Sequence, residues 1–214
     1  YDSSNYVFLA SMSHAEYGDG LAVYKPVAGE APLSDFPYGS LHRREVAAYE
    51  LSRLLGWRLI PPVVEREGPR GIGSMQLFIE HDPDAHYFAV RADERLHPQY
   101  IRLAAFDLIS NNADRKGGHM LLDRTGNIWA IDNALCFHRI DKLRTVIWDF
   151  AGDPLPTELA DDLDAFLSRD LDPALAEILD PFERDAVRTR ARALLTKGKL
   201  PTDPSGQRFP WPLV

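Results

Sequence analysis

The sequence is poor in cysteine, with Cys136 alone among 214 residues. A single thiol excludes a disulfide framework and a cysteine-based zinc cluster. Long apolar runs are missing too, because no stretch approaches the roughly 18 residues of a membrane-spanning helix, and no signal-peptide pattern opens the chain. We therefore expect a cytoplasmic protein without integral membrane association.

Positive charge is also scarce. The chain has 24 Lys and Arg residues against 32 Asp and Glu residues, which gives a net charge of −8. A protein without a basic surface cannot neutralise nucleic acid phosphates or bind strongly to an anionic membrane, so we expect no nucleic-acid partner. The remaining composition, 45% hydrophobic and 26% charged, is that of a globular protein. Its length suffices for one substantial core or two small lobes that share a cleft.

The most informative segment is 111–137, where two acids stand at the mouths of two short apolar runs joined by a tight turn. The resulting hairpin would bring Asp114 and Asp132 together at one end, each beside a polar partner, His119 and Asn133 respectively. Paired oxygen ligands with a nearby base are what metal-assisted phosphoryl transfer requires. The spacing is typical of a kinase catalytic loop followed by a metal-binding loop.

The first 80 residues are predicted to be rich in strands. Four short β-prone runs are expected, at 6–11, 20–25, 63–67 and 73–80, with turns at 17–20 and 68–71. Between the second and third runs, apolar residues repeat with helical period from residue 41, after a predicted cap at Ser40 and before a stop at Gly56. This part would form a small lobe, residues 1–80.

The second part, residues 81–214, is predicted to be mostly helical. Residues 81–97 are polar and irregular, which suggests a boundary between lobes. Three amphipathic helices are expected beyond it, at 101–109, 157–169 and 181–197, followed by a proline-rich tail from 201 to 214.

Lys25 ends an apolar strand and is followed by a proline that stops the pairing. Its ammonium could bind nucleotide phosphates as a point charge, or it could be a solvated lysine at a strand end. Glu45, one turn into the following helix, could hold Lys25 in place, although an exposed glutamate on a helix is ordinary.

Two further segments could contact a nucleotide. The hydroxyl and amide groups of Ser3, Ser4 and Asn5 could cradle phosphate, or they could form a simple turn. The extended segment at the lobe boundary could offer backbone groups to a base, or it could be a core strand. That segment contains Gln76, Leu77, Phe78 and Ile79.

The two acids differ in how strongly the sequence supports a function. Asp114 lies in a polar, glycine-containing stretch, so a surface turn is the simpler interpretation. Asp132 lies within an otherwise apolar run, where a lone carboxylate is costly without a partner. We therefore expect a functional role for Asp132 first.

These segments, taken in order, resemble the phosphatidylinositol 3-/4-kinase-like superfamily. The likeness is greatest to type II phosphatidylinositol 4-kinases and to a related group of bacterial proteins. The ordered motifs are Val-Tyr-Lys25-Pro with Gly-Glu-Ala-Pro soon after, Glu45 before Ala-Ala-Tyr, Ile60-Pro-Pro62, Gly73-Ser-Met-Gln-Leu-Phe-Ile-Glu80, Asp107-Leu-Ile-Ser-Asn-Asn-Ala-Asp114-Arg115 and Ala130-Ile-Asp132-Asn133-Ala-Leu-Cys-Phe137. They span most of residues 3–150. The resemblance implies an α+β, two-lobed, protein-kinase-like fold, with a β-rich N-lobe and a helical C-lobe.

The resemblance also implies roles for single residues. Lys25 would bind ATP phosphates and Glu45 would orient it. The Leu77–Ile79 backbone would receive adenine, with Ile131 packed beneath the ring. Asp114 would be the catalytic acid of its loop, either as the base or as the group that positions the acceptor hydroxyl. Asp132 would hold Mg²⁺.

One position departs from the family pattern. The family has asparagine five residues after the catalytic-loop aspartate, where this chain has His119. Imidazole is a poor ligand for Mg²⁺, so His119 would contact phosphate, favour Mn²⁺ or act through a water. The cysteine-rich membrane-anchoring insert of the eukaryotic enzymes is also absent, so lipid specificity is not implied.

The sequence thus predicts an ATP- and metal-dependent phosphotransferase that acts on a hydroxyl acceptor. A small polyol such as an inositol derivative, a lipid headgroup and a protein Ser/Thr are all compatible. The rival prediction is a nucleotide-binding pseudokinase that regulates a partner, and His119 supports it. A structural domain that binds no nucleotide is a third alternative.

Overall fold

A four-stranded antiparallel sheet forms the N-terminal part of the protein in the computed structural model, which describes residues 6–16, 18–170 and 173–214. Its strands, in the spatial order β1-β2-β4-β3, are β1 (Phe8–His14), β2 (Gly18–Pro26), β3 (Val63–Gly68) and β4 (Gly71–Leu77). All four predicted strands are present, with ends shifted by a few residues. The central pair aligns Lys25 of β2 with Ser74 of β4.

The first hairpin differs from the prediction in its turn. The predicted turn at 17–20 is wrong, because β2 already begins at Gly18 and Gly20 pairs with Met12 of β1. Residue 17 itself lies outside the described residues. The second hairpin turns at the predicted place, where Gly71 adopts a φ of 89° that favours glycine.

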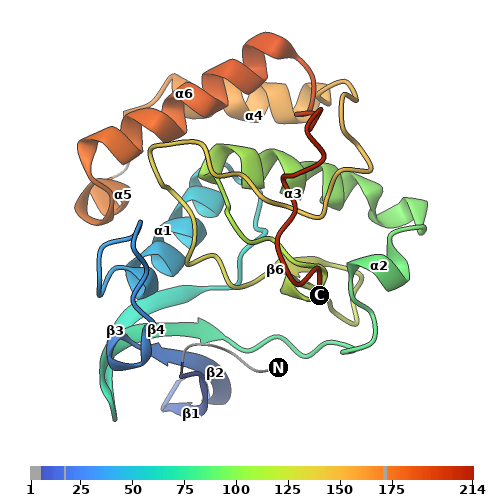
Figure 1. Cartoon of the computed structure of the whole chain (residues 1–214). Coiled ribbons are helices and arrows are strands. Elements are labelled where there is room, and N and C mark those ends of the chain that lie inside the picture. Colours follow the sequence, from blue (N-terminus) through green and yellow to red (C-terminus); the bar gives the residue numbers. More distant parts are fainter. Residues whose placement is uncertain (1–5, 17, 171–172) are drawn as a thin grey trace.

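Helix α1 (Leu41–Leu54) lies between the sheet and the helices of the C-terminal part (Figure 1). The predicted cap by Ser40 is wrong: its hydroxyl donates to the Pro37 carbonyl instead. Glu30 caps the helix from a distance, because its carboxylate accepts from the backbone N–H groups of Leu41 and His42, at 3.3 and 2.9 Å. The glycine predicted to end the helix, Gly56, has a φ of 72° just beyond it.

The C-terminal part holds the other helices and a small hairpin. Its elements are α2 (Tyr87–Val90), α3 (His97–Ser110), β5 (Met120–Leu122), β6 (Ile128–Ala130), α4 (Thr157–Leu167), α5 (Pro173–Ile178) and α6 (Pro181–Lys197). Short 3₁₀ turns lie at Val27–Gly29, Glu94–Leu96 and Gly117–His119. The three predicted helices and the hairpin are present, whereas α2 and α5 were not predicted.

One buried apolar cluster joins α1 to the C-terminal helices. Ala47 and Leu51 of α1 belong to the same cluster as Phe106 of α3, Leu163 of α4 and Val187 of α6, and all five are fully or almost fully buried. Burying a large apolar side chain contributes roughly 1.5–3 kcal/mol. The position of α1, and hence of Glu45, is therefore fixed by packing against the C-terminal part as well as against the sheet.

The proline-rich tail has no helix or strand and runs past β6 toward the sheet (Figure 1). Its Leu213 carbonyl accepts from the backbone N–H of Gly117, at 2.7 Å. Among the described residues, no helix is both long and apolar enough to cross a bilayer.

Candidate active site

Lys25 points from β2 toward two carboxylates from distant parts of the chain. Its Nζ lies 2.6 Å from Oε1 of Glu45 on α1 and 2.9 Å from Oδ1 of Asp132, in the loop after β6. Burial alone would lower the pKa of Lys25, but the attraction of Asp132 and Glu45 outweighs it and raises the pKa above its ordinary value. The ammonium is therefore charged and held at a fixed position.

Glu45 makes a second contact with its other oxygen. Oε2 accepts from the backbone N–H of Asn133, at 2.9 Å, and the side chain is almost completely buried. A single carboxylate thus joins Lys25 of the sheet to the residue that follows Asp132. The predicted pairing of Glu45 with Lys25 is present, and the bond to Asn133 was not predicted.

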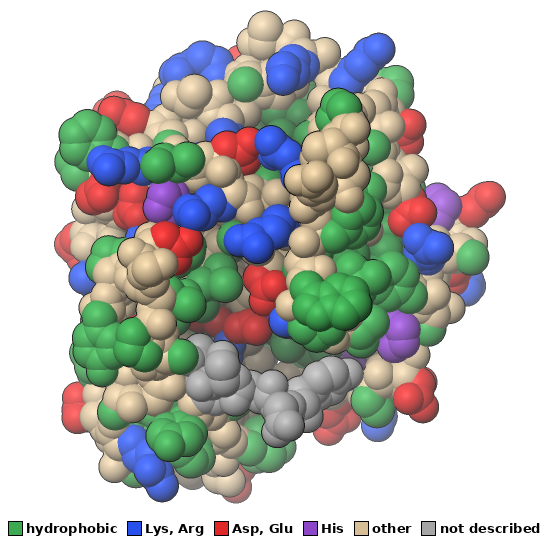
Figure 2. Space-filling model, viewed as in Figure 1, with side chains coloured by type: hydrophobic (Ala, Val, Ile, Leu, Met, Phe, Trp, Pro, Cys, Tyr) green, Lys and Arg blue, Asp and Glu red, His purple; other side chains and the backbone are tan. Residues whose placement is uncertain are grey.

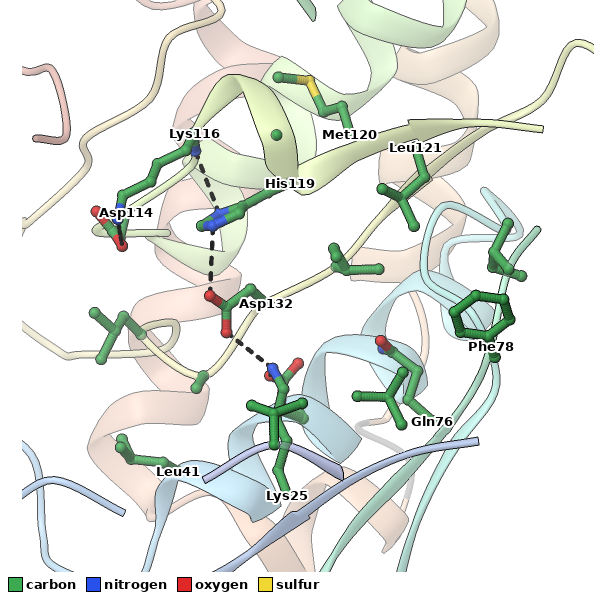
Figure 3. Close-up of a pocket in the computed structure, with 18 of the residues that line it drawn as sticks. Lys25, Leu41, Gln76, Phe78, Asp114, Lys116, His119, Met120, Leu121 and Asp132 are labelled. Carbon is green, nitrogen blue, oxygen red and sulfur yellow. Dashed lines mark hydrogen bonds and ion pairs between the residues drawn. The ribbon is translucent and has the colours of Figure 1, made fainter. Parts of the chain in front are cut away.

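Asp132 lies between Lys25 and His119, and 46% of its side chain is exposed (Figure 3). Attraction to Lys25 lowers its pKa below the ordinary value despite burial, so the carboxylate is ionised. Its second oxygen, Oδ2, lies 3.4 Å from Nε2 of His119. Burial lowers the pKa of His119 to about 4, so this imidazole is neutral at neutral pH.

Asp114 lies in the loop that follows α3, on the other side of His119 (Figure 3). Its backbone N–H donates to the side chain of Asn112, and its Oδ2 lies 3.2 Å from Nζ of Lys116. Burial raises the pKa of Asp114, and Lys116 only partly counters this. The backbone N–H of Lys116 donates to Nδ1 of His119 at 3.4 Å, so Lys116 and His119 lie between the two acids and each contacts one of them.

A fully buried ion pair supports both acid-bearing loops. The guanidinium of Arg115 binds Asp107 of α3, the Ile131 carbonyl and the Asn133 side chain. This pair was not predicted, because the composition of the stretch around Asp114 and Arg115 favours a surface turn. A signal was present, because Asp107 is a lone acid within an apolar helical run, as Asp132 is within its own run.

A cavity of about 720 Å³ lies between the sheet and the loops of the C-terminal part. Figure 2 shows acidic and basic side chains gathered around a hollow on this face. The cavity is lined by the predicted site residues Lys25, Glu45, Gln76, Leu77, Phe78, Ile79, Asp114, His119, Ile131 and Asp132. The structure therefore brings together ten of the predicted residues. Pro212 and Val214 of the tail, which were not predicted, also line it.

The segment after β4 offers backbone groups beside the cavity. The Leu77 N–H donates to the Pro62 carbonyl at 2.8 Å, and the Phe78 N–H donates to the Leu21 carbonyl at 3.0 Å. Proline has no N–H, so Pro62 cannot return a bond to the Leu77 carbonyl. Leu77 and Phe78 both line the cavity.

Other predicted elements lie elsewhere. Ser3, Ser4 and Asn5 are outside the described residues. Lys142 and Trp148 do not line the cavity: Lys142 pairs with Asp35 at 2.8 Å, and the Trp148 indole donates to the Arg208 carbonyl. In the described part of the chain, no group of three or more His, Cys, Asp or Glu residues could hold a metal ion.

Comparison with known proteins places the chain in a family. It is 39% identical over 227 residues to protein Rv2133c of Mycobacterium tuberculosis, a match that covers 89% of this chain and 81% of the relative. The chain belongs to the family of Rv2133c. The name of that relative states no activity, and no family model matches the sequence.

Comparison of structures shows the type of fold. The crystal structure of CtkA, a proinflammatory kinase of Helicobacter pylori, matches with a TM-score of 0.54 over 94% of this chain and 90% of that chain. The sequence identity is 11%, so the likeness concerns the fold alone. The chain has a kinase-like α+β fold, as predicted. The closer likeness to phosphatidylinositol 3-/4-kinases stays a prediction.

Proposed function

We propose that this protein is an ATP-dependent phosphotransferase that transfers a phosphoryl group to a hydroxyl acceptor. The observation that carries the proposal is the three-way contact of Lys25 with Glu45 and Asp132 at the bottom of a cavity that Asp114 also lines. Phosphoryl transfer depends mainly on positioning and on charge stabilisation, and needs little covalent help. A fixed cation, an ionised carboxylate and a second acid in one cleft meet those needs.

Each side chain has a distinct part in this proposal. Lys25 binds the phosphates as a point charge, and Glu45 holds it in place. Asp114 faces the acceptor and either takes its proton or positions its hydroxyl; burial raises the pKa of Asp114 and so makes it a stronger base than an exposed aspartate. Adenine would lie between Ile131 and the Leu77–Ile79 backbone.

The donor set suits a divalent cation that arrives with the nucleotide. Mg²⁺ and Mn²⁺ prefer oxygen ligands and are commonly held by one or two carboxylates together with phosphate oxygens. Asp132 supplies an ionised carboxylate, and His119 adds a nitrogen that Mn²⁺ accepts more readily than Mg²⁺. A bound cation would neutralise phosphate charge. The acceptor is open: an inositol-type molecule, a lipid headgroup or a protein Ser/Thr all carry the required hydroxyl.

The rival function, a regulatory pseudokinase that binds nucleotide without turnover, has its own support. His119 faces Asp132 where the resembling family has asparagine, and the described residues contain no group of three or more His, Cys, Asp or Glu side chains that could hold a metal ion. Binding with slow or no transfer would follow if these ligands hold a metal poorly.

The experiment is transfer of label from γ-labelled ATP, with Mg²⁺ and Mn²⁺ tested separately. We expect hydrolysis or autophosphorylation that falls at least a hundredfold in Asp132→Asn, because the substitution removes the ionised ligand. The matched control is Asp93→Asn, which breaks a surface pair with Arg95 outside the cavity and should leave turnover unchanged. Nucleotide binding without turnover in either metal would favour the pseudokinase, and absence of binding would reject both.

A further inference from the structure

The backbone of Asp132 has an unusual conformation. Its φ is 57°, in the left-handed region that residues other than glycine adopt rarely. Such a conformation persists only when the surrounding contacts hold it, and it is commonly found where function requires a particular side-chain direction. The contacts on either side of Asp132 therefore decide where its carboxylate points.

Arg115 makes two of these contacts, one with each neighbour of Asp132. Its Nη1 donates to the Ile131 carbonyl at 2.8 Å, and its Nη2 donates to Oδ1 of Asn133 at 2.6 Å. Asn133 is also bound from the opposite side, where its N–H donates to Glu45. The two nitrogens of one planar group thus hold the residues before and after the strained position.

The guanidinium is itself held rigidly. Asp107 accepts from Nε of Arg115 at 3.1 Å and from its Nη2 at 3.0 Å, and both side chains are fully buried. The Thr145 hydroxyl donates to the other oxygen of Asp107 at 3.2 Å. Because α3 is packed in the core, this anchor fixes Arg115 relative to the body of the protein.

We propose that Arg115 is a positioning residue, whose forked guanidinium holds Asp132 in the left-handed conformation and thereby aims its carboxylate into the cavity. The inference rests on the proposed function, because it assigns Arg115 to the binding of metal and nucleotide phosphates by Asp132. Arg115 lines no part of the cavity and acts only through the backbone and side chain of its neighbours.

The alternative is a purely structural role, in which Arg115 only stabilises the core. Its contacts to Asp107 would serve either role, whereas its contacts to Ile131 and Asn133 hold the two residues that flank Asp132. The variant Arg115→Lys separates the two roles. Lysine keeps a charge that can reach Asp107, but its single ammonium cannot reproduce the planar fork.

The test is calorimetric titration with a non-hydrolysable ATP analogue, in EDTA and then in Mn²⁺. In EDTA we expect Arg115→Lys to bind within about twofold of the wild type. The Mn²⁺-dependent gain in affinity should fall roughly 10- to 100-fold, the usual effect of removing a group that orients a metal ligand. In the Asp132→Asn background, Arg115→Lys should cause no further loss. A purely structural role predicts equal losses with and without Mn²⁺, in both backgrounds, and would overturn the inference.

Two further variants keep the result interpretable. Thr145→Val weakens the same buried network at its far end, so it should lower the thermal unfolding midpoint but keep the Mn²⁺-dependent gain. Asn133→Ala removes one of the two holding bonds without touching Asp107, and should reduce that gain even if Arg115→Lys fails to fold. An unchanged gain in Asn133→Ala would count against the inference. If wild-type protein binds no nucleotide in either condition, the proposed function itself fails.

Discussion

Two of the aspartate–cation pairs in the described residues, Asp107–Arg115 and Asp132–Lys25, differ in their access to the cavity. Asp107 and Arg115 are fully buried, whereas 46% of the Asp132 side chain and 21% of the Lys25 side chain are exposed. Burial raises the pKa of Asp107 although Arg115 opposes it, while Lys25 lowers the pKa of Asp132 although burial opposes that. For the Asp107 carboxyl of this closed pair (Asp107–Arg115) desolvation dominates, and for the Asp132 carboxyl of the open pair (Asp132–Lys25) the attraction dominates.

The difference indicates what each pair is for. A buried pair gains from its fixed geometry but costs a great deal when one partner is lost. A pair at the floor of a cavity can exchange one partner for a ligand, since water or phosphate can replace the missing charge. We infer that the Asp107 pair holds the two loops in place, and that the Asp132 pair is available for chemistry.

The same substitution, aspartate to asparagine, should have very different effects on the free energy of unfolding in the closed and the open pair. Asp107→Asn leaves the Arg115 charge buried without a counter-charge, so we expect the free energy of unfolding to fall by roughly 3–5 kcal/mol. Asp132→Asn should cost less than about 1 kcal/mol, because Lys25 keeps Glu45 and asparagine tolerates a positive φ. Urea denaturation of the two variants measures both values. Similar losses in the two would show that the pairs are energetically equivalent.

Glu45 is buried and contacts Lys25 of the open pair, so its substitution should lower the free energy of unfolding by an amount between those for Asp107→Asn and Asp132→Asn. Glu45→Gln removes a charge from Lys25 and turns one acceptor into a donor that faces either the ammonium or the Asn133 N–H. We expect a loss of about 1.5–3 kcal/mol, the range for hydrogen bonds to charged groups. The control is Glu158→Gln, an exposed glutamate paired with Arg102, which should change the urea midpoint very little. If Glu45→Gln leaves the urea midpoint unchanged, the contacts of Glu45 contribute no more to stability than an exposed surface pair does.

The open pair was largely predictable from the sequence, whereas in the closed pair only Asp107 gave a local signal. Lys25, Glu45 and Asp132 each stand out locally, by a strand end, a helical position and a lone acid in an apolar run. Arg115 gave no such signal, because its partners lie on α3, in the loop after β6 and, through Asp107, at Thr145. Hydrophobic periodicity predicts elements and their faces, but it does not predict which polar groups meet after the elements pack.

Local conformation set a second limit on prediction. The positive φ of Asp132 could not be predicted from the sequence, because glycine is the residue that usually indicates this conformation and position 132 is not a glycine. The cap of α1 was misassigned for a related reason: Ser40 stands at the expected place, but the carboxylate that caps the helix comes from Glu30, ten residues earlier. Side chains that act from a distance can replace the local residue that a pattern favours.

The smallest expected effect concerns a polar group that the cavity leaves unsatisfied. Gln76 of β4 is buried, and its Nε2 has no hydrogen-bond partner among the residues that the structure describes. Gln99 is the matched control, because its amide donates to the Gly126 carbonyl and accepts from the Ile128 N–H, both at 2.8 Å. The two glutamines therefore differ in whether the fold itself uses them.

Substitution by methionine, which keeps the length of the side chain, should have opposite effects at the two positions. Gln76→Met removes an unpaired buried group and should raise the free energy of unfolding by about 1 kcal/mol, whereas Gln99→Met loses two bonds and should lower it by about 1–2 kcal/mol. Urea midpoints without ligand measure both changes. A loss in Gln76→Met would mean that its amide supports the fold. A gain would mean that the cavity keeps a polar group at a cost to stability, as expected of a surface shaped for a ligand.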